Sequence, residues 1–176
     1  MKREVRICQD SWGPEWSCPS RHTAIQRAFA GYLDEHFRPD AIAILNTPSP
    51  LGLARFRTQL SEWRNSSENL HPRGLCPSRS NRKFEYIASL EYGLNPRRAR
   101  EGRLHAHVLL YNLNSMRLED IARQWRELNK IKNPEEPLLR PYTPGPEGIL
   151  YALKSWGSDV DLVHFSPKLR LNMAAK

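Results

Sequence analysis

Residues 102–111 read GRLHAHVLLY, an apolar run that carries histidines at two alternate positions. Side chains at i and i+2 of a strand point to the same face of a sheet, so His105 and His107 are expected to face one way. The residues that alternate with them face the other way: Leu104, Ala106 and Val108. An earlier run, FEYIASLE at 84–91, also has strand character, and a loop of glycine, proline and arginine joins the two. The pattern predicts a β-hairpin with both histidines on one face.

Two histidines side by side on a strand can share one divalent metal ion when a third ligand comes from elsewhere. Glu91 ends the earlier strand, and the hairpin would bring its carboxylate to the histidine face. The sequence therefore predicts a metal site formed by Glu91, His105 and His107. The alternative interpretation is that both histidines are ordinary polar residues on a half-exposed strand.

The rest of the chain predicts helices and strands around this hairpin. Apolar spacing predicts four helices: 21–37 capped by Ser20, 51–64, a helix capped by Asn114 or Ser115 that runs to 129, and 147–157. Two further strands are expected at 41–46 and 160–165. Turn residues and prolines predict loops at 65–80 and 133–146. This order favours an α+β fold, in which helices pack against one face of a central antiparallel β-sheet. At 176 residues the chain is expected to form a single domain.

Composition and charge indicate the class of partner. The formal net charge is +8, and residues 41–176 account for all of it, because residues 1–40 carry six basic and six acidic side chains. A basic chain rich in arginine favours a polyanionic partner, although solubility alone would also explain the charge. The chain holds 39% hydrophobic and 26% charged residues and lacks a long apolar run, so we expect a soluble, cytoplasmic protein without a membrane segment. Its three cysteines fit a reducing compartment.

Tyr151 and Lys154 lie three residues apart in the predicted helix 147–157, so they are expected to share a face. A phenol beside a metal site can attack a phosphate, and a lysine can favour the phenolate or balance the charge on phosphorus. Most tyrosine–lysine pairs at this spacing are instead a packed ring and a surface amine. The arginines of the hairpin loop are either solvated or positioned to hold a DNA backbone: Arg97, Arg98, Arg100 and Arg103.

Taken together, these motifs resemble the HUH endonucleases, specifically the replication initiators of rolling-circle plasmids and single-stranded DNA viruses. The histidine pair flanking Ala106 resembles the motif that names the family, and Glu91 resembles the acidic residue that completes the metal site in many members. The segment Tyr151-Ala152-Leu153-Lys154 resembles the nucleophile motif. Glu147 and Ser155 stand four residues from Tyr151, where some members carry a second tyrosine, so the resemblance is to the one-tyrosine type. It covers residues 41–165, the expected catalytic core, and leaves residues 1–40 as an N-terminal helical extension.

The resemblance implies site-specific nicking and joining of single-stranded DNA at an origin hairpin or nick site. Tyr151 would form a 5′-phosphotyrosine with help from Lys154, and Mg²⁺ or Mn²⁺ would bind Glu91, His105 and His107. The sequence lacks a phosphate-binding loop of the GxxxxGK[ST] type, so we expect either a nicking domain alone or one that recruits a host helicase as partner. The protein is expected to be a monomer or a weak dimer.

Other functions remain open at this point. Within the same chemistry, the alternatives are a transposase or a conjugative relaxase. Outside it, the chain would be a non-catalytic nucleic-acid-binding module, whose tryptophans stack on bases or pack in the core: Trp63, Trp125 and Trp156. A pure binding module has no need for the ordered set of Glu91, two histidines, Tyr151 and Lys154, and the set therefore favours the enzyme.

Overall fold

The computed structural model describes residues 24–47, 51–71, 82–92, 104–153 and 163–169. The helices and strands follow in the order α1 (Ala24–His36), β1 (Ala41–Leu45), α2 (Leu53–Ser66), the 3₁₀-helix η3 (Ser67–Leu70), β2 (Glu85–Tyr92), β3 (Leu104–Tyr111), α3 (Leu118–Asn129), β4 (Leu138–Pro141), α4 (Pro146–Ala152) and β5 (Val163–Phe165). The predicted α+β class is confirmed.

The five strands form one antiparallel sheet in the order β4-β1-β3-β2-β5. Strand β3, which carries the two histidines, lies in the middle. The segment from β1 to β4 runs strand, helix, strand, strand, helix, strand, which is the split βαβ arrangement. The predicted hairpin is therefore the centre of the sheet, flanked by strands on both sides.

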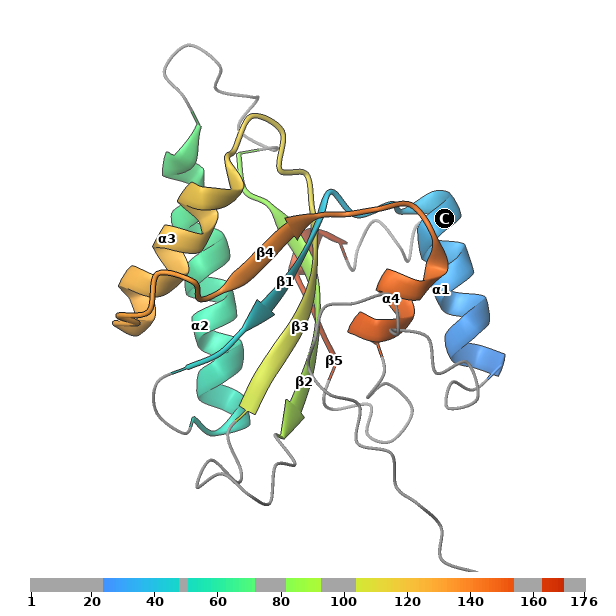
Figure 1. The fold of residues 1–176 in the computed structure, drawn as a ribbon, viewed down its shortest axis with the longest axis horizontal. Coiled ribbons are helices and arrows are strands. Elements are labelled where there is room, and N and C mark those ends of the chain that lie inside the picture. The colour runs from blue at the N-terminus through green and yellow to red at the C-terminus, as the bar shows by residue number, and fades with distance from the viewer. Residues whose placement is uncertain (1–23, 48–50, 72–81, 93–103, 154–162, 170–176) are drawn as a thin grey trace, which may run out of the picture.

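Helices cover both faces of this sheet, whereas the sequence led us to expect them on one (Figure 1). Helices α2 and α3 cover one face, where Trp63 and Trp125 are fully buried and meet edge to face with ring centroids 5.2 Å apart. Helices α1 and α4 cover the other face, over Ile42, Ile87 and Leu109. The second layer exists because β3 is apolar on both faces: Leu109 and Tyr111 alternate with Val108 and Leu110, and all four are buried.

Burial settles the role of two of the three tryptophans. The indoles of Trp63 and Trp125 are 0% exposed, and each donates its N–H to a backbone oxygen, of Ile121 and Asn46 respectively. They pack in the core and do not face a ligand. Trp156 lies outside the described residues.

Several predicted boundaries were wrong. Helix α2 continues through Ser66 and η3 through Leu70, in a segment that we expected to be a loop. Helix α3 begins at Leu118 with Arg117 as its N-cap, two or three residues after the expected cap, Ser115 or Asn114. The proline-rich segment holds the edge strand β4, which tolerates Pro141 at its end because an edge strand leaves one row of backbone groups unpaired.

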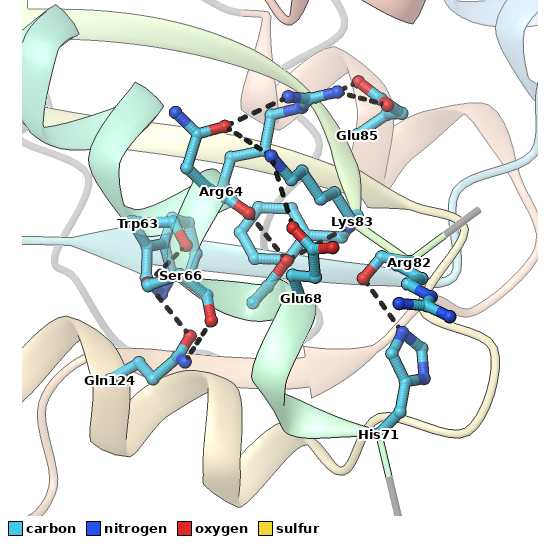
Figure 2. A network of polar contacts seen from close by, with 12 residues as sticks. Trp63, Arg64, Ser66, Glu68, His71, Arg82, Lys83, Glu85 and Gln124 are labelled. Atoms are coloured by element: carbon cyan, nitrogen blue, oxygen red, sulfur yellow. Dashed lines mark hydrogen bonds and ion pairs between the residues drawn. The ribbon is translucent and has the colours of Figure 1, made fainter. Parts of the chain in front are cut away.

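A buried ion pair joins α2 to the start of β2, as Figure 2 shows. Arg64 donates from Nη2 to Glu85 Oε1 at 2.6 Å and from Nε to Glu85 Oε2 at 3.0 Å. The Glu85 side chain is 2% exposed and that of Arg64 is 15% exposed. Lys83 and Glu68 form a more exposed pair beside it. This two-pronged contact fixes the beginning of β2, the strand that carries Glu91 at its other end.

Candidate active site

The hairpin register places Glu91 directly opposite His105, and Ser89 directly opposite His107. Cross-strand partners point to the same face, so all four side chains lie on the face covered by α1 and α4. Glu91 Oε2 lies 3.4 Å from His105 Nε2 and 3.6 Å from His107 Nε2. One carboxylate oxygen therefore sits between two imidazole nitrogens, as the sequence predicted.

The three side chains differ in their access to solvent. The His107 side chain is 2% exposed, Glu91 11% and His105 24%. His107 is thus the most buried of the three side chains and His105 the most accessible to solvent. A buried histidine held by packing is a pre-oriented ligand, because its ring has few alternative rotamers.

The geometry of this cluster suits a divalent metal ion. Its ligand atoms all lie within 4.8 Å of one another. Ligands about 2.1 Å from an ion at tetrahedral or octahedral angles stand roughly 3–3.5 Å apart, which matches the two distances to Glu91 Oε2. Two imidazoles and a carboxylate form a mixed nitrogen and oxygen set, compatible with several divalent metals. The cluster can hold a metal ion, and other ligand positions would remain for substrate or water.

Tyr151 lies against this cluster. Its ring meets the His107 ring at a centroid distance of 4.8 Å and an interplanar angle of 88°. The rings of His107 and His105 are in contact in turn, with centroids 5.1 Å apart. A phenol from a helix that is distant from the hairpin in sequence is thereby held beside the candidate metal ligands.

Close packing of α4 on the sheet brings Tyr151 to that position. Gly148 faces β1: a Cβ added there would lie 3.0 Å from Ile42 Cδ1 and 3.5 Å from Tyr142 Cε2. Ile149 and Ala152 of the same helix are buried among the core residues beneath it. Glycine at position 148 therefore lets the helix backbone approach the sheet, and Tyr151 follows one turn later.

The start of α4 is tied to α1. The Tyr142 hydroxyl donates to Asp34 Oδ1 at 2.6 Å, and the Gly145 N–H donates to the same oxygen at 3.3 Å. The bond from Tyr142, supported by the Gly145 N–H and by Arg38, lowers the pKa of Asp34 despite partial desolvation. Burial, followed by the hydrogen bond to Asp34, raises the pKa of Tyr142. Helix α1, placed by the sequence in an N-terminal extension, is thus part of the support for the tyrosine.

Two residues near the site were missed in the sequence. Ser89 is 0% exposed, lies opposite His107, and its Oγ makes no hydrogen bond within the described residues. Alternation along β2 from Glu91 would have placed Ser89 on the same face as the histidines.

The second missed residue is Arg140 of β4, which lies opposite Ile42 of β1. Burial lowers the pKa of Arg140, and attraction to the Tyr151 oxygen opposes that shift. Arg140 was missed because β4 itself was not expected.

The remaining predicted site residues lie outside the described residues. These are Lys154 and the four arginines of the hairpin loop, Arg97, Arg98, Arg100 and Arg103. Helix α4 ends at Ala152, five residues before its expected end, and Leu153 caps it with φ −104° and ψ 13°. The expected shared helical face of Tyr151 and Lys154 therefore stays a prediction.

Comparison of the chain with protein-family models, curated proteins and solved structures finds no match. In the part of the chain that the structure describes, no helix combines the length and apolar character needed to cross a membrane. The function must therefore be argued from the site itself.

Proposed function

We propose that the protein nicks and rejoins single-stranded DNA, with Tyr151 as nucleophile and with a divalent metal ion bound by Glu91, His105 and His107. The observation that carries the proposal is the packing of the Tyr151 ring against His107, inside a cluster whose ligand atoms lie within 4.8 Å of one another. A tyrosine that served only in packing would not require a carboxylate and two imidazoles around it, so the cluster favours a chemical role for Tyr151.

The reaction is a transesterification. The Tyr151 oxygen attacks phosphorus and forms a P–O bond, while the bond from phosphorus to the 3′ oxygen breaks. The phenol loses its proton and the leaving 3′ oxygen gains one, so the step involves no net proton uptake. The products are a 5′-phosphotyrosine and a free 3′ hydroxyl. One phosphate ester replaces another, and a 3′ hydroxyl can therefore reverse the step and rejoin the strand.

The chain's own residues have separate tasks in this scheme. A divalent ion at the cluster would supply positive charge beside a non-bridging phosphate oxygen. Glu91 and His107 are both largely buried, and they would therefore hold the ion at a fixed position relative to Tyr151. His105, the most exposed of the three, borders the approach to the site. Gly148 and the link from Tyr142 to Asp34 hold the nucleophile's helix in place.

Three of the other described tyrosines are poor nucleophiles. Burial raises the pKa values of Tyr86 and Tyr111, and the hydroxyl of Tyr142 is committed to Asp34. A buried phenol with a raised pKa is rarely ionised and is not open to a DNA strand. Tyr151 is the one among these four that borders candidate metal ligands.

The finer assignment is a one-tyrosine replication initiator that uses Mg²⁺ or Mn²⁺. The net charge of +8 supports a nucleic-acid partner. Lys154 would assist the tyrosine, and Arg97, Arg98, Arg100 and Arg103 would contact the DNA backbone. A host helicase would open the duplex. A transposase or relaxase performs the same chemistry, and the cluster of two histidines and one glutamate is less typical of relaxases, which usually carry three histidines.

The test is covalent capture of DNA. The full chain is mixed with Mn²⁺ and a pool of single-stranded oligonucleotides with a randomised centre, and protein-bound DNA is isolated under denaturing conditions and sequenced. We expect an adduct enriched in one sequence, lost with EDTA and with Tyr151→Phe, and retained with Tyr32→Phe, which alters a tyrosine on α1 that is 37% exposed. An adduct that survives Tyr151→Phe would refute the assignment of the nucleophile. Salt-sensitive binding without any adduct would leave a binding module.

A further inference from the structure

Ser89 is a fully buried serine on the sheet face that carries the metal cluster. It lies opposite His107 in the pairing of β2 with β3, and Glu91 follows two residues later on its own strand. Cross-strand partners have Cβ atoms about 4.5–5.5 Å apart, and residues at i and i+2 of a strand share a face. Ser89 therefore borders two of the three candidate metal ligands.

The Ser89 hydroxyl differs from those of the other fully buried serines. Among the described residues, three serines are 0% exposed: Ser67, Ser89 and Ser166. Ser67 Oγ donates to the Arg64 carbonyl at 2.7 Å, and Ser166 Oγ accepts from the Tyr86 N–H at 3.0 Å. Ser89 Oγ makes no hydrogen bond within the described residues. A buried hydroxyl without a partner destabilises a fold, so alanine at position 89 would be better for the fold alone.

The neighbours of Ser89 on the sheet indicate the direction in which its hydroxyl can find a partner. On the side away from His107 it lies opposite Val163 of β5, and Ile87 precedes it by two residues on the same face. Both are apolar, and Ile87 is 1% exposed. Its other two neighbours on this face are His107 and Glu91. Polar groups of the sheet therefore lie around Ser89 only in the direction of the cluster.

The length of the side chain determines how Ser89 can act on a metal ion. Its oxygen is bonded directly to Cβ, whereas each histidine approaches Glu91 Oε2 with Nε2, at the far end of its ring, at 3.4 Å for His105 and 3.6 Å for His107. An ion held by those atoms would stand further from the sheet than the serine oxygen. A water ligand of the ion can bridge this difference, because hard divalent ions such as Mg²⁺ usually keep several bound waters.

We infer that Ser89 is a positioning residue of the metal site, whose hydroxyl forms a hydrogen bond with a water ligand of the ion held by Glu91, His105 and His107. This inference rests on the metal site of the proposed function and adds to it a residue that acts through bound water. Groups that hydrogen-bond to the ligands of a metal raise its affinity, commonly by ten- to a hundredfold. The hydroxyl gains its partner when the ion binds.

The test measures metal affinity and stability separately, with Mn²⁺ alone as the probe and the full chain as the protein. Ser89→Ala should weaken Mn²⁺ binding by about tenfold or more in a titration followed by electron paramagnetic resonance. In EDTA the same variant should unfold about 2–4 °C higher than wild type, because it lacks a buried hydroxyl without a partner. Ser89→Thr keeps the hydroxyl and adds a methyl group to a filled site, so it should bind Mn²⁺ nearly as wild type does although its unfolding midpoint falls.

Ser166→Ala is the matched control, because it removes a buried serine hydroxyl that accepts a hydrogen bond from Tyr86. It should lower the unfolding midpoint and leave the Mn²⁺ affinity unchanged. Wild-type Mn²⁺ affinity in Ser89→Ala would overturn the inference, and so would equal losses of affinity in Ser89→Ala and Ser89→Thr. Either result would leave the Tyr151 adduct and the metal site intact. Absence of Mn²⁺ binding by the wild-type chain would instead refute the metal site itself, and this inference with it.

Discussion

Gly148 offers the sharpest test of how the fold positions the nucleophile. In Gly148→Ala, the new Cβ would lie 3.0 Å from Ile42 Cδ1, closer than the roughly 3.5–4.0 Å of a favourable carbon contact. Ile42 is 2% exposed and has little room to yield. Overpacking of this kind costs about 1–3 kcal/mol, while alanine in place of glycine favours a helix by about 1 kcal/mol. The net loss of stability should therefore be about 0–2 kcal/mol.

The Ile42→Val background isolates the overlap, because valine lacks the δ carbon. There the overlap is gone, and Gly148→Ala should instead stabilise the protein by about 1 kcal/mol. The two substitutions should thus show a coupling energy of about 1–3 kcal/mol in urea unfolding. Gly31→Ala is the matched control: a Cβ at that α1 position meets nothing within 4 Å, so alanine should stabilise α1 in either background.

Activity should follow the same pattern. A shift of α4 by a fraction of an ångström moves Tyr151 relative to His107, and a displacement near 1 Å can cost about a hundredfold in rate. Adduct formation should therefore fall in Gly148→Ala and recover in the double variant. An identical effect of Gly148→Ala in the wild-type and Ile42→Val backgrounds would refute the reasoning, because the overlap would then play no part.

Two further predictions concern the supports of the site. Tyr142→Phe should raise the pKa of Asp34 toward 3.8, measured by NMR titration, because the hydrogen bond from Tyr142 is the largest cause of its lowering. A carboxyl with a lowered folded pKa stabilises the fold above its unfolded pKa, so the stability advantage of wild type over Tyr142→Phe should shrink as the pH falls below about 4; a constant advantage would contradict this. Arg64→Ala should destabilise the chain by about 3–5 kcal/mol, because it leaves the Glu85 carboxylate buried and unpaired. The double change Arg64→Met with Glu85→Leu should recover most of that loss, and failure to do so would show that the pair itself is required.

The centre of the fold and most of the candidate site follow from local sequence patterns. Alternation with period two places His105 and His107 together, and a hairpin is the simplest connection that brings Glu91 to them. Both are properties of adjacent segments, so a single sequence is enough to predict them. Local spacing along the helices likewise predicted that Trp63 and Trp125 pack in the core, because each lies on the apolar face of its helix, and both are buried.

Other features depend on contacts between distant segments. The strand order places β4 beside β1, and nothing near Arg140 in the sequence indicates that it lies opposite Ile42. The proline-rich composition of that segment argued against any regular structure, but hydrogen bonds to β1 outweighed it. Helices on both faces were not expected. Leu109 and Tyr111 follow His105 and His107 on the same face of β3, and these two apolar side chains are buried beneath α1 and α4. The histidines drew attention to the polar part of this face, although its other half is apolar.

The central claim is that Glu91, His105 and His107 hold a divalent metal ion, and Mn²⁺ binding to the full chain tests it most directly. Titration followed by electron paramagnetic resonance should show one bound Mn²⁺ per chain. Glu91→Gln, which keeps the shape of the side chain, should lose that site, whereas His36→Ala, on α1 with a side chain 46% exposed, should keep it. A Mn²⁺ stoichiometry and affinity unchanged by Glu91→Gln would contradict the account, and the cluster would then be an ordinary carboxylate–histidine contact.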